Sequence, residues 1–347
     1  MISLFHPYVP EEAIETISNV LRSKQLAQGS QVDLFEKKFG EIFNVNYPVS
    51  VNSGTSALET AYDLLHLGEE DEVITSPLTC VATNMPLLQR RCKIVWADIR
   101  KDTLTLDRED VERKITPRTK AIVNVHLGGI ESSIGSFYLG GQKIPTVADS
   151  CQALGIFTGD YVACSFQAIK HITTGDGGML VCPTEETFRR AKLLRWFGID
   201  RDSKETSRLI NLEPKMLGHK RHMNDIDATL GLEGLKDYHR TLVYRWHLFE
   251  IYREKLGDIL IDGDNNVCWT ATILVDKRDE LQRYLKECGV ESDILHIRND
   301  IYKIFGGYRQ DLPNLNAIED KYLSIPLHPR MSVWDVHKIC SIIKRGW

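Results

Sequence analysis

The sequence lacks the marks of several protein classes. Its longest apolar runs fall far short of a membrane span, and its N-terminus lacks the charged and apolar regions of a signal peptide. The eight cysteines include no CxxC pair, and several stand inside apolar stretches. We therefore expect a soluble, cytoplasmic protein whose cysteines are reduced, with no membrane partner, disulfide framework or metal site. The cysteines are Cys80, Cys92, Cys151, Cys164, Cys182, Cys268, Cys288 and Cys340.

An excess of positive charge is also missing. The net charge is −5 and the isoelectric point is about 6.1, which argues against a surface that binds nucleic acid. The basic clusters at 89–91 and 220–222 are short and are most simply solvated faces or local anion contacts. No internal repeat or low-complexity segment is present. With 347 residues, 42% of them hydrophobic, the chain is long enough for two domains.

Helical and strand patterns alternate through the first two thirds of the chain. This alternation predicts an α/β fold with a largely parallel sheet and helices on both faces. The expected helices span residues 11–23, 80–89 and 185–198, with further helices after residue 54 and from 105–107, and the expected strands span 72–76, 93–98, 120–127 and 177–183.

A long helical pattern then runs from Asn224, a good N-cap residue, to about Leu256. We expect this helix to carry the chain out of a large domain, residues 1–235, into a smaller α+β domain, residues 236–347. In the smaller domain the expected strands are 265–275 and 292–297, and the expected helices are 277–289 and 332–345.

Lys170 is the residue that says most about chemistry. It stands between an apolar strand pattern and a glycine-rich turn, in SFQAIKHITTGDGG. A lysine near glycines is usually a solvated loop residue, so Lys170 alone is a weak signal. Its placement nevertheless suits a Schiff base with pyridoxal 5′-phosphate (PLP). That cofactor needs an amine for its aldehyde, an anion near its ring nitrogen and fixed donors around its phosphate.

Candidates for the other two needs lie upstream of Lys170. Ser53–Ser56 precede a helical pattern, so backbone N–H groups and hydroxyls meet the positive end of a helix, as in a phosphate site. Asp149 ends the apolar run PTVAD, which reads as a buried strand. The carboxyl end of such a strand faces the crevice where open α/β sheets bind ligands. Gln152 follows and is placed to donate to the phenolic oxygen of PLP.

These residues carry a resemblance that runs along nearly the whole chain. The sequence resembles the DegT/DnrJ/EryC1/StrS family of PLP-dependent nucleotide-sugar aminotransferases, a branch of the fold-type I aminotransferases. The collinear matching stretches are QLAQGSQVDLFEKKF, SVNSGTSAL, DEVITSPLTCVATN, ITPRTKAIVNVHLGG, VADSCQALG, SFQAIKHITTGDGGMLV, LLRWFGIDR, LGHKRHMNDIDATLG and LSIPLHP.

The resemblance implies a role for each candidate. Lys170 would form the Schiff base and then move protons, Asp149 would pair with the protonated ring nitrogen, and Gln152 would contact the phenolic oxygen. The phosphate would be held by Thr55, Ser56 and Ser165, with Gly54 allowing close approach of the backbone.

The chain departs from the family pattern in several places. Many members carry an asparagine, in a GYNYRM-type segment, that reaches the phosphate from the partner subunit. Here the segment reads GHKRHM, and Lys220 stands at that position. Cys80 replaces the aromatic residue that often stacks on the ring. The chain between Asp149 and Lys170 is shorter than usual, which predicts a trimmed surface hairpin. The short Gly- and Ser-rich segment 128–145 predicts a stunted helix.

The resemblance also implies the reaction. A related dehydratase branch carries histidine where Lys170 stands; here His171 follows the lysine instead, which favours transamination and a structural role for His171. We expect an aminotransferase that uses glutamate as donor and a nucleotide-linked keto-deoxy sugar as acceptor, passing through pyridoxamine 5′-phosphate. The resemblance further implies a homodimer with sites at the subunit interface.

Two alternatives stay open at this point. One is another PLP enzyme of the family, such as a cyclitol aminotransferase or a keto-sugar dehydratase. The other is a PLP-binding regulatory protein without turnover, which the presence of both Lys170 and Asp149 disfavours. The candidates for the substrate end are His296, Arg298 and Asn299 in HIRND and His328 in SIPLHP, each of which could equally pack between domains.

Overall fold

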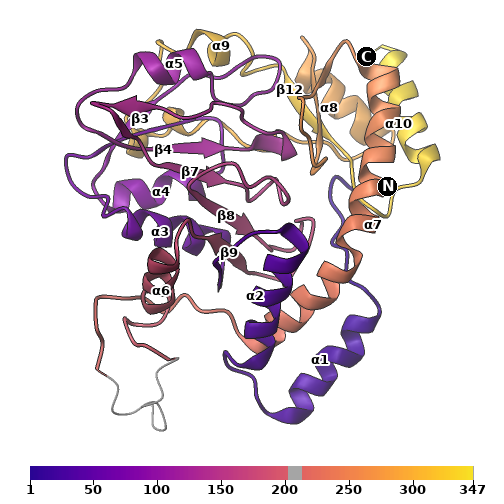
Figure 1. The fold of residues 1–347 in the computed structure, drawn as a ribbon. Helices are drawn as coiled ribbons and strands as arrows, with labels where there is room; N and C mark the ends of the chain where they lie inside the picture. Colours follow the sequence, from indigo (N-terminus) through magenta and orange to yellow (C-terminus); the bar gives the residue numbers. More distant parts are fainter. Residues whose placement is uncertain (202–212, 347) are drawn as a thin grey trace.

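The computed structural model describes residues 1–201 and 213–346. Within them lies a sheet of seven strands in the order β1-β9-β8-β7-β4-β2-β3 (Figure 1). Neighbouring strands from β8 to β3 run parallel, and β9 runs antiparallel to both of its neighbours, so the predicted mostly parallel α/β sheet is confirmed. The strands are β1 (Pro48–Val51), β2 (Glu72–Thr75), β3 (Lys93–Trp96), β4 (Thr119–Val125), β7 (Thr146–Asp149), β8 (Tyr161–Ser165) and β9 (Gly178–Val181).

Apolar layers cover both faces of this sheet. Successive side chains of a strand point to opposite faces, so Val147 packs with α3 (Gly54–Leu64) and α6 (Glu185–Leu194). The next residue, Ala148, packs on the other face with α2 (Ser30–Phe43) and the first part of α7. Because both faces are buried, the parallel strands are apolar almost throughout. The shorter helices α4 (Val81–Gln89) and α5 (Arg108–Arg113) complete the layers.

Helix α7 (Asp225–Leu256) joins two hydrophobic cores. It begins at Asn224, whose side-chain Oδ1 accepts a hydrogen bond from the Asp227 backbone N–H at 2.9 Å, as its predicted N-cap role requires. The helix packs on the large sheet as far as Leu242, and from Tyr244 it packs against the C-terminal core. The division of domains at residue 235 remains a prediction.

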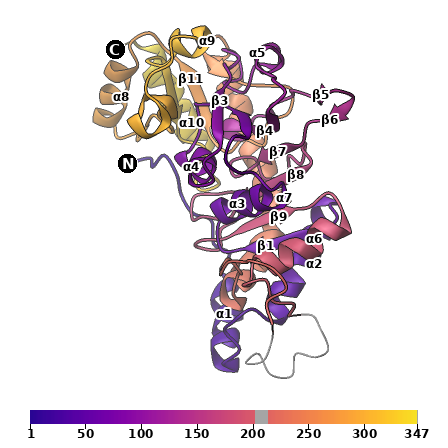
Figure 2. The same cartoon turned by 90° about the vertical axis from the view of Figure 1, so that its left-hand side faces the viewer.

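The C-terminal core surrounds a small antiparallel sheet of β10 (Leu260–Ile261), β11 (Ala271–Leu274) and β12 (Tyr322–Ile325). Helices α8 (Arg278–Glu287) and α10 (Val333–Lys344) pack on this sheet, and α9 (Pro313–Asn316) follows the HIRND segment. The N-terminus joins the same region, because Ile2 pairs with Val290 in a short parallel bridge. Figure 2 shows α8 and α10 at the opposite end of the molecule from α1 (Glu12–Ser23).

Two strand predictions for the C-terminal part are wrong. The strand expected at 265–275 is limited to β11, because Val267 and Thr270 donate their backbone N–H groups to Gly129 and Gly128 instead. The strand expected at 292–297 is reduced to one bridge, between Asp293 and Ser324. β11 instead pairs with β10 on one side and β12 on the other, and the sequence patterns singled out neither of these strands.

The segment after β4 is irregular, as its Gly and Ser content predicts. A single 3-10 turn, Leu127–Gly129, leads to a small hairpin of β5 (Tyr138–Leu139) and β6 (Gln142–Lys143). Between β7 and β8 the chain makes only turns. None of the helices in the described parts of the chain combines the length and the apolar character needed to cross a membrane.

Candidate active site

The candidate site lies where the carboxyl ends of two parallel strands meet the start of a helix. Asp149 is the last residue of β7, Ser165 is the last residue of β8, and Gly54 is the first residue of α3. A Cβ atom added to Gly54 would lie 2.7 Å from Cys151 Sγ and 2.8 Å from Ser165 Cβ. Only a glycine allows the start of α3 to approach the strand ends this closely.

Lys170 enters this site from the turn after β8, where its backbone N–H donates to the Gln167 carbonyl at 2.9 Å. Burial lowers the pKa of the Lys170 amine, and the nearby Cys151 and Asp149 side chains oppose that shift. The amine therefore gives up its proton more readily than an exposed lysine does. Its Nζ lies 3.9 Å from the centre of the Trp269 ring, a residue that the sequence did not single out.

Two donors fix the buried carboxylate of Asp149. Thr83 Oγ1 donates to Oδ2 at 2.7 Å, and the Cys151 backbone N–H donates to Oδ1 at 3.1 Å. Thr79 shares a hydrogen bond of 2.9 Å with the Thr83 hydroxyl. Thr83 lies inside the largely apolar helix α4, and for this reason sequence reasoning missed it.

His126 packs behind the same strand end. Its backbone N–H donates to the Asp149 carbonyl at 3.1 Å, and its Nδ1 accepts from the Ser132 backbone N–H at 3.0 Å. Burial lowers the pKa of His126 to about 4. The ring is thus neutral near pH 7 and acts as an acceptor.

The turn at the start of α3 presents hydroxyls and backbone donors. Ser53 caps the helix, since its Oγ accepts from the Ser56 backbone N–H at 3.0 Å, and Ser56 Oγ donates to Asn52 Oδ1 at 2.7 Å. Thr55 follows Gly54 in the first turn, and Ser165 Oγ accepts from the Gln167 N–H at 3.3 Å. The arrangement suits an anion, because the positive end of a helix and several hydroxyls converge.

Gln152 links the site to the C-terminal part of the chain. Its Oε1 accepts from the Gly128 backbone N–H at 2.8 Å, and its Nε2 lies 2.7 Å from His296 Nε2. Burial lowers the pKa of His296 to about 3, so the ring is neutral and accepts from the amide. His296 is therefore the substrate-end candidate that the structure brings to the site.

The structure holds the other substrate-end candidates in packing contacts. Arg298 is buried in ion pairs of 2.6 Å with both Asp300 and Glu319. Asn299 Nδ2 donates to the Thr79 carbonyl at 2.8 Å. The remaining candidate, His328, bonds through Nε2 to the Ser3 carbonyl at 3.1 Å, and burial lowers its pKa to about 4.

Lys220 lies on an exposed segment that the next residue, Arg221, holds against helix α3. The neighbouring Arg221 pairs with Glu59 at 3.0 Å and with Asp63 at 2.7 Å on α3, and its carbonyl accepts from the Asn52 N–H at 2.7 Å. The segment is thereby fixed while the Lys220 side chain is exposed.

Two residues beside the site have local surroundings that limit their roles. Cys80 stands at the N-cap of α4 and is half-buried. His171 is buried, its Nε2 bonds to the Val267 carbonyl at 2.7 Å, and burial lowers its pKa to about 3. These contacts agree with the structural role expected for His171.

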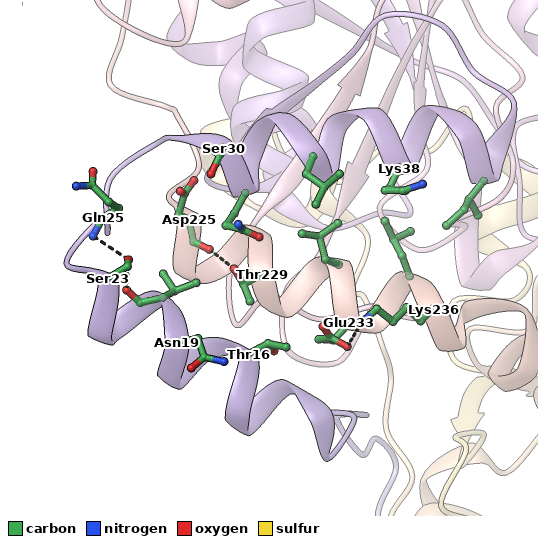
Figure 3. A pocket seen from close by; sticks show the side chains of 16 residues that line it. Thr16, Asn19, Ser23, Gln25, Ser30, Lys38, Asp225, Thr229, Glu233 and Lys236 are labelled. Atoms are coloured by element: carbon green, nitrogen blue, oxygen red, sulfur yellow. Dashed lines mark hydrogen bonds and ion pairs between the residues drawn. The ribbon is translucent and has the colours of Figure 1, made fainter.

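A separate groove of about 600 Å³ lies between α1, α2 and α7 (Figure 3). Asp225 at the start of α7 accepts from the Gly29 backbone N–H at 2.8 Å and so fixes the entry to α2. None of the predicted site residues lines this groove.

Comparisons with known proteins identify the family of the whole chain. The model of the DegT/DnrJ/EryC1/StrS aminotransferase family matches residues 7–344. The spore coat polysaccharide biosynthesis protein SpsC of Bacillus subtilis is 31% identical, over 97% of this chain and 95% of SpsC. AtS13 of Actinomadura melliaura superposes with a TM-score of 0.92 at 30% identity, covering 100% of this chain and 99% of AtS13. The sugar aminotransferase CalS13 of Micromonospora echinospora gives the same TM-score at 28% identity, with full coverage of both chains.

Proposed function

Because the chain belongs to the DegT/DnrJ/EryC1/StrS aminotransferase family and is thus a PLP-dependent aminotransferase, we propose that it transfers an amino group from glutamate to a nucleotide-linked keto-deoxy sugar. Two relatives, a spore coat polysaccharide biosynthesis protein and a sugar aminotransferase, support a sugar as acceptor. The keto group is the part of the acceptor that an amine can replace.

One observation carries the proposal: the Lys170 amine is partly desolvated and lies near a buried carboxylate and an anion-binding turn. Burial lowers the pKa of Lys170, so its free amine is more populated than in water. A lysine whose pKa is lowered in this way can act as a nucleophile and as a base more readily than an exposed lysine. In an exposed loop, water would stabilise the ammonium, and the lysine would stay protonated and unreactive.

The residues fit PLP. Gly54 lets the start of α3 lie close against Ser165, since a Cβ there would come within 2.8 Å of Ser165 Cβ, and the phosphate would be held at this turn by Thr55, Ser56 and Ser165. When bound, PLP carries the amino group between the two substrates and draws electrons from the carbon that loses its proton. Asp149, held by Thr83, would provide the negative charge opposite the ring nitrogen. Cys80 and Gln152 would also contact the cofactor.

Proton movement falls to Lys170. Its Nζ would take the proton from the reacting carbon of the donor and return a proton during the reaction of the sugar. His171 does not compete for this task, because its ring is bonded to the Val267 carbonyl and its pKa of about 3 makes it a poor base. Gln152, oriented by Gly128 and His296, would hold the phenolic oxygen of the cofactor by its second N–H.

We further propose a homodimer in which Lys220 reaches the phosphate of the partner's site. Its exposure and the anchoring of its segment by Arg221 support this role. A lysine ammonium suits a phosphate as a point charge. The enzyme would work in the cytoplasm, where its free cysteines stay reduced.

The test is a two-stage assay with purified protein. In the first stage, PLP-loaded protein is mixed with single amino acids, and the absorbance change on conversion to the pyridoxamine 5′-phosphate form identifies the donor. In the second stage, that form is mixed with a panel of nucleotide-linked keto sugars, free keto sugars and keto-cyclitols. Mass spectrometry then measures which acceptor gains an amine.

We expect glutamate to be the best donor and a nucleotide-linked keto sugar to be aminated. Amination of a keto-cyclitol alone would replace the proposed acceptor. Loss of water from a keto sugar without gain of nitrogen would indicate a dehydratase. PLP binding without either half-reaction would indicate a regulatory protein.

A further inference from the structure

The indole of Trp269 forms a platform under the Lys170 amine. Lys170 Nζ lies 3.9 Å from the ring centre, and the Trp269 side chain is fully buried. The indole N–H donates to the carbonyl of Ile169, the residue before the lysine, at 3.0 Å. Phe5 stacks with the same indole, with ring centres 5.2 Å apart and planes at 25°. The ring therefore touches both the side chain and the backbone of the lysine segment.

The backbone around Trp269 is fixed by contacts that do not involve Lys170. Val267 donates its N–H to the Gly129 carbonyl at 2.9 Å, and a Cβ on Gly129 would lie 2.8 Å from the Trp269 nitrogen. The buried Arg245 donates from Nη1 to the Trp269 carbonyl at 3.3 Å. These contacts hold the ring in place before any ligand arrives, so its position under the amine is set by the fold.

We propose that Trp269 is a positioning residue that holds the protonated Lys170 amine on the face of its indole whenever that amine is free of the cofactor. This inference rests on the proposed function, in which Lys170 takes a proton and must later return it. Of the aromatic side chains, tryptophan attracts a cation most strongly, and the attraction grows where water is excluded. The ring would keep the ammonium, and hence the proton, beside the reacting atoms.

The indole would oppose the effect of burial on Lys170. Burial lowers the pKa of the amine, whereas an aromatic face stabilises its protonated form. The other titratable groups near the amine are two cysteines, a carboxylate and two histidines. They are Cys80, Cys151, Asp149, His171 and His296. Both histidines are neutral near pH 7, so their charge does not change over the range in which the ring effect is measured.

The experiment measures the reactivity of the Lys170 amine in the cofactor-free, full-length protein. The protein is treated with a trace of acetic anhydride at a series of pH values, and mass spectrometry of the Lys170 peptide gives the acetylation rate. The variants are Trp269→Leu, which keeps apolar bulk, and Trp269→Phe, which keeps a weaker aromatic face. Trp334→Leu on α10, at an exposed tryptophan, is the matched control. Circular dichroism and melting temperature check that each variant is folded.

We expect the midpoint of the acetylation curve to move to lower pH in Trp269→Leu. At a fixed pH below the midpoint its acetylation rate should rise about five- to thirtyfold, the equivalent of losing about 1–2 kcal/mol of cation–π attraction at a site without water. Trp269→Phe should fall between this variant and the wild type, and Trp334→Leu should match the wild type. If Trp269→Leu does not fold, the intermediate shift in Trp269→Phe serves as the test.

A midpoint that stays in place would overturn the inference. A midpoint that moves to higher pH would also overturn it, because the ring would then act by excluding water alone. The proposed function is tested separately, by borohydride reduction of the wild type with PLP. Failure of Lys170 to be labelled there, together with the expected midpoint shift, would refute the PLP function and leave the contact between ring and ammonium standing.

Discussion

Gly178 offers the sharpest test of how the proposed phosphate-binding turn is supported. It is the first residue of β9 and lies directly behind the turn that precedes α3. A Cβ at this position would overlap the Ser53 carbonyl oxygen and lie 2.5 Å from the Ser53 carbonyl carbon and 2.8 Å from the Gly54 nitrogen. These are backbone atoms, so they cannot swing aside as a flexible side chain can. In Gly178→Ala the turn itself must move.

The added methyl group has no free space at this position. Inserting such a group into a well-packed region typically lowers the free energy of unfolding by about 1–3 kcal/mol. If the turn relaxes in the free protein and must return to its native shape to hold phosphate, the same energy is lost from PLP binding. Every 1.4 kcal/mol corresponds to about a tenfold change in Kd. Gly178→Ala should therefore raise the Kd for PLP by about tenfold or more and lower the melting temperature of the cofactor-free protein.

Absorbance titration with PLP measures the Kd, and differential scanning fluorimetry measures the melting temperature. Gly68→Ala is the matched control, because a Cβ at Gly68 meets no atom within 4 Å. The control should bind PLP as the wild type does. A normal Kd and a normal melting temperature in Gly178→Ala would refute the argument that this close approach shapes the phosphate site.

Further predictions concern the lysine, the carboxylate and pH. Lys170→Ala should lose the label that borohydride fixes between PLP and the chain, as peptide mapping would reveal; a persistent label elsewhere would contradict the assignment. Asp149→Asn keeps the shape but loses the charge opposite the ring nitrogen, so PLP should still bind while stopped-flow rates of both half-reactions fall by orders of magnitude. Near-normal rates would place the ring's partner elsewhere. The free energy of unfolding should fall as pH drops below 6.5, because the pKa of His126 is about 4 in the folded state and the unfolded chain takes up the proton first. This loss of unfolding free energy reaches about 1.4 kcal/mol at about pH 5.5. In urea unfolding, the free energy of His126→Gln should depend less on pH than that of the wild type. An equal pH dependence in both proteins would contradict the role given to His126.

The central part of the site could be predicted from sequence because its chemistry follows local patterns. Asp149 ends an apolar strand, and the carboxyl ends of parallel strands share one edge of the sheet. Ser53 and Gly54 open a helix, which is a local signal for an anion site. Lys170 stands one turn beyond another strand of the same sheet. Strand order then brings these residues together.

The residues that escaped prediction depend on contacts far apart in the sequence. The segment around Trp269 resembles a continuous strand, yet its backbone pairs with Gly128 and Gly129 in a loop about 140 residues earlier. That pairing limits the strand to β11, and the indole of Trp269, just before it, lies against the Lys170 amine. Likewise, Thr83 looks like part of an apolar helix, and only the packing of α4 beside β7 aims its hydroxyl at Asp149. No local pattern encodes either contact.

The length of helix α7 sets the distance and the relative rotation between the two sheets. An α-helix turns by about 100° and rises by about 1.5 Å per residue. Deleting one residue between Leu242 and Leu248 would rotate Tyr252 and everything after it out of the C-terminal core. Inserting seven residues would nearly restore the rotation but would move the end of the helix by about 10 Å. The Trp269 indole would then move away from the Lys170 amine. The contact between this amine and this ring therefore constrains the length of the helix.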